Sequence, residues 1–149
     1  IEAHPERIAY VHADVTVESD LDLTFVYDAP DGASDGRKPL TQGLFYTRLS
    51  QRLIGAITAP TAEGKLFEVD MRLRPSGNAG PIATSLEAFA RYQRESAWTW
   101  EHMALTRARI IYAPDFVAAP LNDAIRDILT APRDGDALLG DVADMRMIG

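Results

Sequence analysis

Apolar and polar residues alternate along residues 19–27, and this alternation predicts a half-buried strand. Asp20 and Asp22 share one face of the predicted strand. The opposite face is apolar and carries Leu21, Leu23 and Phe25. The strand therefore presents two carboxylates on one side and a core-forming surface on the other.

A second alternating stretch predicts another acidic strand, over residues 66–73. One face of this stretch is charged and carries Glu68, Asp70, Arg72 and Arg74. Two such strands side by side would place Asp70 next to Asp20 and Asp22. Arg72 and Arg74 are interpreted either as phosphate-neutralising groups or as partners of the neighbouring acids.

The three carboxylates of these strands suggest a cation site. Side chains two residues apart on a strand are about 6.6–6.8 Å apart, so Asp20 and Asp22 can reach one ion. Carboxylates on one face repel one another unless a cation lies among them, and magnesium prefers such oxygen ligands. The arrangement with Asp70 predicts metal-assisted phosphoryl or nucleotidyl transfer, although a solvated strand edge would look the same.

Between and before these strands the pattern predicts a helix and a further strand. Apolar spacing of three and four residues predicts a helix over residues 41–59, ended by Pro60. A strand, a helix and a second strand can form a crossover, and mixed or antiparallel pairing stays open. Residues 8–11 are predicted to form a short strand in a hairpin with the first acidic strand.

The remainder of the chain is predicted to be helical. Thr84 is the expected N-cap of the first helix, with Glu87 completing a capping box. Trp98 and Trp100 are most simply interpreted as core residues. Further helical patterns cover residues 98–111, 119–130 and 137–148. Before these helices, Ser76 and Gly77 lie in a Gly-rich run that can bring backbone amides close to a phosphate.

Composition narrows the possible functions. The chain has 149 residues, of which 46% are hydrophobic and 25% are charged, as in an ordinary globular protein. A formal net charge of −7 argues against general nucleic-acid binding, which needs a basic face. There is no cysteine for a disulfide or thiolate metal site. No apolar run approaches the ~20 residues of a membrane span, so we expect a cytoplasmic protein without membrane contact. Because the chain starts at Ile1 without Met and stops inside an apolar-periodic segment, we expect it to be a piece of a longer protein.

Three blocks of the sequence, residues 19–28, 66–80 and 97–109, together resemble glutamine synthetase adenylyltransferase. The similarity runs from about residue 15 to the end of the chain. It implies an α+β fold, with a polymerase-β-like nucleotidyltransferase sheet over residues 1–83 and a helical subdomain over residues 84–149.

The resemblance also implies an activity. Enzymes of this family carry two nucleotidyltransferase domains: one attaches AMP from ATP to a tyrosine of glutamine synthetase, and the other removes it by phosphorolysis. The blocks over residues 75–80 and 95–102 resemble the C-terminal, adenylylating half. The implied partners are glutamine synthetase as protein substrate and, through the parent enzyme, a PII-type signal protein.

Site residues follow from the same resemblance. It makes Asp20 and Asp22 the paired ligands of Mg²⁺, with Mn²⁺ as a possible substitute, and Asp70 the third catalytic and metal-binding carboxylate. The expected nucleotide-binding residues are Ser19, Arg72, Arg74, Ser76 and Gly77.

One position departs from the family pattern. The family has a Gly-Gly or Gly-Ser element several residues before the paired aspartates, and an ungapped count from Asp20 places Val11 and His12 there. Neither residue replaces glycine where backbone must approach a phosphate. Either nucleotide binding is impaired or the sequence lacks a short segment near residues 9–14. The first case admits a non-catalytic regulatory or protein-binding module as an alternative function.

Overall fold

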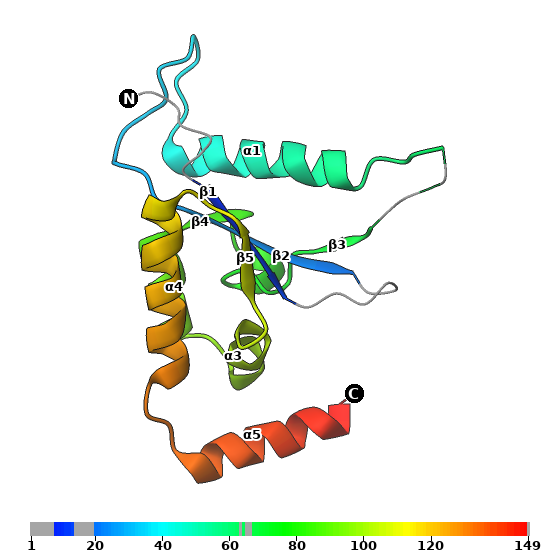
Figure 1. The fold of residues 1–149 in the computed structure, drawn as a ribbon, viewed down its shortest axis with the longest axis vertical. Helices are drawn as coiled ribbons and strands as arrows, with labels where there is room; N and C mark the ends of the chain where they lie inside the picture. Colours follow the sequence, from blue (N-terminus) through cyan, green and yellow to red (C-terminus); the bar gives the residue numbers. More distant parts are fainter. Residues whose placement is uncertain (1–7, 14–19, 63, 65–66, 149) are drawn as a thin grey trace.

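The computed structural model describes residues 8–13, 20–62, 64 and 67–148 (Figure 1). The strands are β1 (Ile8–Ala13), β2 (Leu21–Tyr27), β3 (Val69–Asp70), β4 (Ala83–Ser85) and β5 (Arg109–Tyr112). The helices are α1 (Gln42–Ile57), α2 (Leu86–Glu95), α3 (Thr99–Leu105), α4 (Asp115–Thr130) and α5 (Gly135–Ile148). A short 3₁₀ turn covers Gly77–Ala79.

The strands form one mixed sheet around β2. Strands β3, β2, β1 and β5 follow one another in space, and β4 also pairs with β2. The predicted hairpin is confirmed, because β1 runs antiparallel to β2. Strands β3 and β4 both run parallel to β2, at its start and at its end respectively. The fold is therefore α+β.

The two faces of the sheet are covered by different helices (Figure 1). On one face, Leu23, Phe25 and Tyr27 pack against α1, where the rings of Tyr27 and Tyr46 stack with centroids 4.5 Å apart. On the other face, Val26 joins a core formed with α2, α3 and α4. That core contains Phe89, Leu105, Val117, Leu121 and Ile128. Alternation along β2 thus supplies both cores.

The helix predicted between the acidic strands is confirmed as α1, which ends before Pro60. The predicted strand over residues 66–73 is shorter than expected, because β3 contains only Val69 and Asp70. The Arg72 N–H donates to Asp70 Oδ1 at 2.8 Å and the chain turns there. Arg72 and Arg74 consequently lie in a turn and not on the sheet face.

The predicted helix over residues 98–111 is wrong in its second half. Helix α3 ends at Leu105, and the chain turns into β5, which pairs antiparallel with β1. The core assignment of the tryptophans is also wrong, because Trp98 is 72% exposed and Trp100 42% exposed. Apolar Ile110 and Ile111 continue the helical spacing in the sequence, which hides the strand.

Two helix starts differ from the prediction. Thr84 lies in β4, and the N-cap of α2 is Ser85, whose Oγ accepts a hydrogen bond from the Ala88 N–H at 3.2 Å. Helix α4 begins at Asp115, so Pro120 lies inside the helix and not in its first turn.

Among the described residues, no helix has the length and apolar character to cross a membrane.

Candidate nucleotide site

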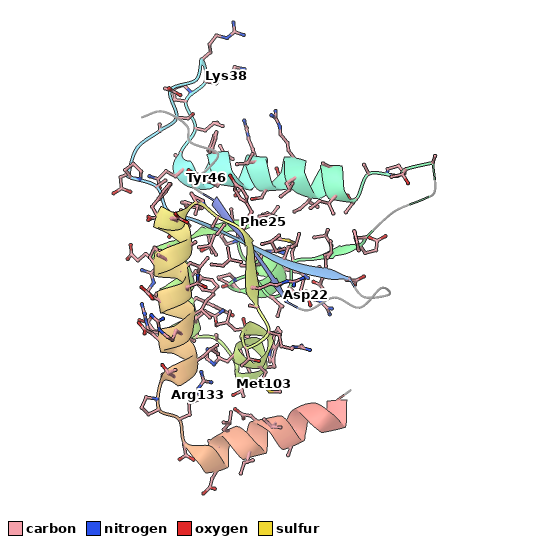
Figure 2. All side chains as sticks on the ribbon, viewed as in Figure 1. Asp22, Phe25, Lys38, Tyr46, Met103 and Arg133 are labelled. Carbon is pink, nitrogen blue, oxygen red and sulfur yellow. The ribbon has the colours of Figure 1, made fainter. Side chains whose placement is uncertain are left out.

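Two carboxylates meet where β2 begins. Asp22 of β2 and Asp70 of β3 are directly opposite each other in the parallel register. The Leu21 N–H donates to Glu68 O at 2.8 Å, which fixes this register. Asp20 is exposed and immediately precedes β2. Figure 2 shows Asp22 at the end of β2 that leads away from Phe25 and the core.

The guanidinium of Arg72 is the cation beside these carboxylates. Its Nε donates a hydrogen bond to Asp70 Oδ2 at 2.5 Å, and its Nη2 lies 2.5 Å from the same oxygen in an ion pair. Burial alone would raise the pKa of Asp70, but the side-chain and backbone hydrogen bonds and the charge of Arg72 outweigh it and lower that pKa. The pKa of Arg72 is raised by Asp70 first and also by the charges of Asp22 and Asp20. Arg72 therefore offsets part of the negative charge that the sequence places here.

A cleft of about 570 Å³ opens beside these groups. Its charged wall consists of Asp22, Asp70 and Arg72. The remaining lining residues are Leu73, Gly77, Asn78 and Trp100. The volume lies within the range of small-molecule sites, about 300–1,000 Å³.

The loop that borders the cleft has a fixed backbone. Ser76 and Gly77 both adopt left-handed conformations, with φ of 63° and 51°. A Cβ at Gly80 would lie 1.8 Å from the Pro75 carbonyl oxygen, so the loop closes only with glycine at that position. Close packing of backbone against backbone thus shapes the rim.

The buried Arg74 side chain holds this loop from within. Its guanidinium donates to the carbonyl oxygens of Met71 at 2.9 Å, Gly80 at 3.3 Å and Asn78 at 3.4 Å. The Gly77 N–H donates to the Arg74 carbonyl at 2.8 Å. The positive charge of Arg74 is therefore directed at loop carbonyls.

A buried acid that the sequence reasoning missed connects the loop to the helices. Glu101 is 4% exposed and accepts hydrogen bonds from the Tyr92 hydroxyl at 3.0 Å and the Trp98 N–H at 2.9 Å. Burial raises the pKa of Tyr92, a hydrogen bond with the Ser76 backbone lowers it, and Glu101 raises it further. The chain of contacts from Ser76 through Tyr92 to Glu101 ties the loop to α2 and α3. The sequence signal for this role of Glu101 is its position directly after Trp100.

Residues 12–122 match the protein family described as Glutamate-ammonia ligase adenylyltransferase. The chain belongs to this family. Three similar proteins, each named bifunctional glutamine synthetase adenylyltransferase/adenylyl-removing enzyme, come from Brucella suis biovar 1 (strain 1330), Xanthobacter autotrophicus and Mesorhizobium japonicum. They are 57%, 52% and 51% identical to the chain over 135, 136 and 135 residues. Each alignment covers 89% of this chain and 14% of the relative, so the chain spans a small part of these adenylyltransferases.

In this member of the adenylyltransferase family, the site residues predicted from sequence separate into two groups. Asp22, Asp70, Arg72 and Gly77 line one cleft. Ser76 lies on its rim loop, Arg74 supports that loop, Asp20 stands just outside β2, and Ser19 lies outside the described residues. The catalytic, metal-binding and nucleotide-binding roles of these residues remain predictions.

The position expected for the family's glycine element is occupied by a central strand. Val11 and His12 belong to β1, where they pair with Thr24 and Leu23 of β2. On its other side β1 pairs with β5. Residues 14–19, which connect β1 to Asp20, lie outside the described residues.

The donor atoms at the cleft suit magnesium. Within the described ranges, no group of three or more His, Asp or Glu side chains converges on one metal position. Magnesium is, however, usually held by one or two carboxylates, with phosphate oxygens and water completing its shell. Asp22 and Asp70, adjacent in register, supply two such carboxylates.

Proposed function

We propose that this chain is the adenylylating domain of its parent enzyme and transfers AMP from ATP to a tyrosine of glutamine synthetase. The observation that carries the proposal is the pair Asp22 and Asp70, held opposite each other at a cleft of nucleotide size. Relatives named adenylyltransferase/adenylyl-removing enzyme share up to 57% identity with 89% of the chain. The mixed sheet with its paired acidic strands is consistent with a polymerase-β-like nucleotidyltransferase fold.

We assign the triphosphate of ATP to the charged wall of the cleft. Asp22 and Asp70, with Asp20 beside them, are the proposed ligands of Mg²⁺ or Mn²⁺. When bound, the metal neutralises phosphate charge and lowers the pKa of an attacking hydroxyl. Arg72, which pairs with Asp70, is the residue that would neutralise phosphate charge at this wall.

The reaction forms a bond between the tyrosine hydroxyl oxygen and the α-phosphorus of ATP and breaks the bond to the leaving pyrophosphate. A free tyrosine has a pKa of about 10, so its proton must be accepted near neutral pH. Asp70 is the proposed acceptor or orienting group. Arg72 lowers the pKa of Asp70, which keeps this carboxylate ionised and able to accept a hydrogen bond from the hydroxyl.

The remaining predicted nucleotide contacts concern the rim loop and the start of β2. The Gly77 N–H already donates to the Arg74 carbonyl, so Gly77 is proposed to allow close approach and not to donate. Ser76 contributes its exposed side chain, and Ser19 is proposed to contact phosphate. Arg74 is proposed to act on the nucleotide through the loop that it holds.

A non-catalytic regulatory or protein-binding module is the second candidate. It is favoured by one observation, the strand pairing of Val11 and His12 where the family has glycines. The paired Asp22 and Asp70 favour the enzyme. Glutamine synthetase as substrate, a PII-type partner acting through the parent enzyme, and a cytoplasmic location all belong to the first proposal.

Intact-mass analysis of unmodified glutamine synthetase tests the proposal. After incubation with the chain, ATP and Mg²⁺, we expect an AMP-sized mass gain on a tyrosine, and no gain with Asp22→Asn. The absence of a gain from the wild-type chain, at enzyme levels equal to those of its target, would refute the adenylylating role of this chain. A gain that persists with Asp22→Asn would refute the assigned carboxylate.

A further inference from the structure

The cleft is lined by apolar side chains as well as by charged ones. Trp100 and Leu73 face the space that Asp22, Asp70 and Arg72 also line. Trp100 is 42% exposed although it is the largest apolar side chain of the cleft. A large exposed aromatic surface in a concave site commonly marks a ligand contact.

Trp100 is half exposed, and its backbone position is determined by the hydrogen bonds and burial of the neighbouring residues. The next residue, Glu101, is buried and hydrogen-bonded to Tyr92 and to the Trp98 N–H. Successive residues of a helix point about 100° apart, so burial of Glu101 directs Trp100 away from the interior. Thr99, at the start of α3, also donates a hydrogen bond to Asp141 of α5. The backbone that carries the indole is therefore held in place before any ligand binds, which reduces the entropy lost on binding.

We infer that Trp100 is the platform on which the purine base of the nucleotide stacks. This rests on the proposed function, because it assigns the base of the same ATP. A nucleoside triphosphate has one polyanionic end and one flat apolar end, and the cleft is lined by charged side chains and by an aromatic one. Any base can stack on an aromatic side chain, and the stacking is strong enough to orient a nucleotide.

Tryptophan fluorescence provides the first test. The chain has two tryptophans, and Trp98 does not line the cleft, so Trp98→Phe leaves Trp100 as the sole indole. With Mg²⁺ present, ATP is expected to quench the fluorescence of this variant in a saturable manner. Inorganic tripolyphosphate, which carries the charge but no base, is expected to leave it unchanged.

Calorimetry on variants provides the second test. Trp100→Ala is expected to weaken MgATP binding roughly 5- to 150-fold, the loss of one stacked base. Trp100→Phe should retain most of the affinity, and both variants should bind Mg-tripolyphosphate as the wild type does. Trp98→Phe is the matched control and should bind MgATP unchanged. The thermal unfolding midpoint of each variant is measured as well. Because both tryptophans are exposed, all midpoints are expected to equal that of the wild type.

Each outcome supports or overturns the inference. Wild-type MgATP affinity in Trp100→Ala, or equal quenching by tripolyphosphate, would overturn it and leave the proposed function standing. In that case Trp100 would be free to contact the protein substrate instead. Absence of MgATP binding to the wild-type chain would overturn both proposals. Stacking without modification of glutamine synthetase would overturn the proposed function alone.

Discussion

The two faces of β2 differ in how their character changes along the strand. The face under α1 is apolar throughout, with Leu23, Phe25 and Tyr27 packed in one core. The opposite face changes from Asp22 at the cleft, through buried Thr24, to Val26 in the core of α2, α3 and α4. One face of β2, the uniform face, is therefore apolar throughout and contributes to stability, whereas the other, the graded face, changes from buried core residues to the polar residues of the cleft.

The neighbouring strands explain why the cleft lies at one end of this graded face. Strand β3 accompanies Leu21 and Asp22, and β4 accompanies residues from Phe25 to Tyr27. The segment that connects β3 to β4, residues 71–82, does not pair with β2. It forms the turn and the Gly-rich loop instead. The cleft thus lies beside the part of β2 where β3 ends, and the core lies beside the part of β2 that pairs with β4.

The largest expected effect comes from the uniform face. Phe25→Ala removes a fully buried ring and should lower the free energy of unfolding by about 3–5 kcal/mol. Urea denaturation measures this loss. Asp22→Asn, on the other face, is the control and should leave the unfolding free energy close to that of the wild type. Equal destabilisation by the two substitutions would show that the faces are not specialised as described.

A smaller loss is expected at the buried acid behind the graded face. Glu101→Ala leaves the Tyr92 hydroxyl and the Trp98 N–H without their acceptor and should cost about 1–3 kcal/mol. Because the same contacts hold the loop at Ser76, MgATP affinity measured under fully folded conditions should also fall. Tyr92→Phe is the comparison variant, and it should loosen the loop while sparing the contact to Trp98. Unchanged nucleotide affinity in both variants would contradict the coupling of loop and helices.

A smaller loss of stability is expected at the junction between β4 and α2, where two neighbouring residues compete as the N-cap of α2. Ser85→Ala removes the N-cap hydrogen bond to the Ala88 N–H and should cost about 1 kcal/mol. Thr84→Val, one residue earlier, should cost less because Thr84 lies in β4 and is not the cap. Thermal unfolding of the two variants decides between the two positions. A larger loss from Thr84→Val would place the cap where the sequence pattern predicts it.

The smallest expected effect is a pH dependence at the charged wall. Arg72 lowers the pKa of Asp70 below its ordinary value of 3.8, so the folded state holds this carboxylate ionised more strongly than the unfolded state does. The resulting stabilisation is complete above about pH 3.8 and is lost as the pH falls through the lower folded-state pKa. The stability difference between wild type and Asp70→Asn, measured by urea denaturation, should therefore shrink between pH 6 and strongly acidic pH. A difference that is constant over this range would contradict the Asp70–Arg72 pairing.

Sequence reasoning predicted the elements whose patterns are long. Strand β2 and helix α1 follow from periodicity over seven residues or more, and β1 was predicted only as a short strand over residues 8–11. Strands β4 and β5, of three and four residues, were missed because such short runs have no period of their own. Ile110 and Ile111 also fit the helical spacing that precedes them, and only pairing with β1 makes them a strand.

The candidate site was predictable in part for a similar reason. The meeting of Asp22 and Asp70 follows from alternation in two neighbouring strands. The positions of Arg72 and Trp100 depend on a turn and on the direction of α3, neither of which alternation determines. The support of the loop by Arg74 and Glu101 depends on side-chain hydrogen bonds within turns and between helices, which alternation of apolar and polar residues does not encode.

The central claim is that the polar end of the graded face binds the metal–nucleotide complex, and a calorimetric titration tests it most directly. ATP is titrated into the wild-type chain and into Asp22→Asn, each with Mg²⁺ and with EDTA. The account predicts that Mg²⁺ strengthens ATP binding to the wild type and that Asp22→Asn loses most of this gain while retaining the metal-free affinity. The same gain from Mg²⁺ in both proteins would contradict the account.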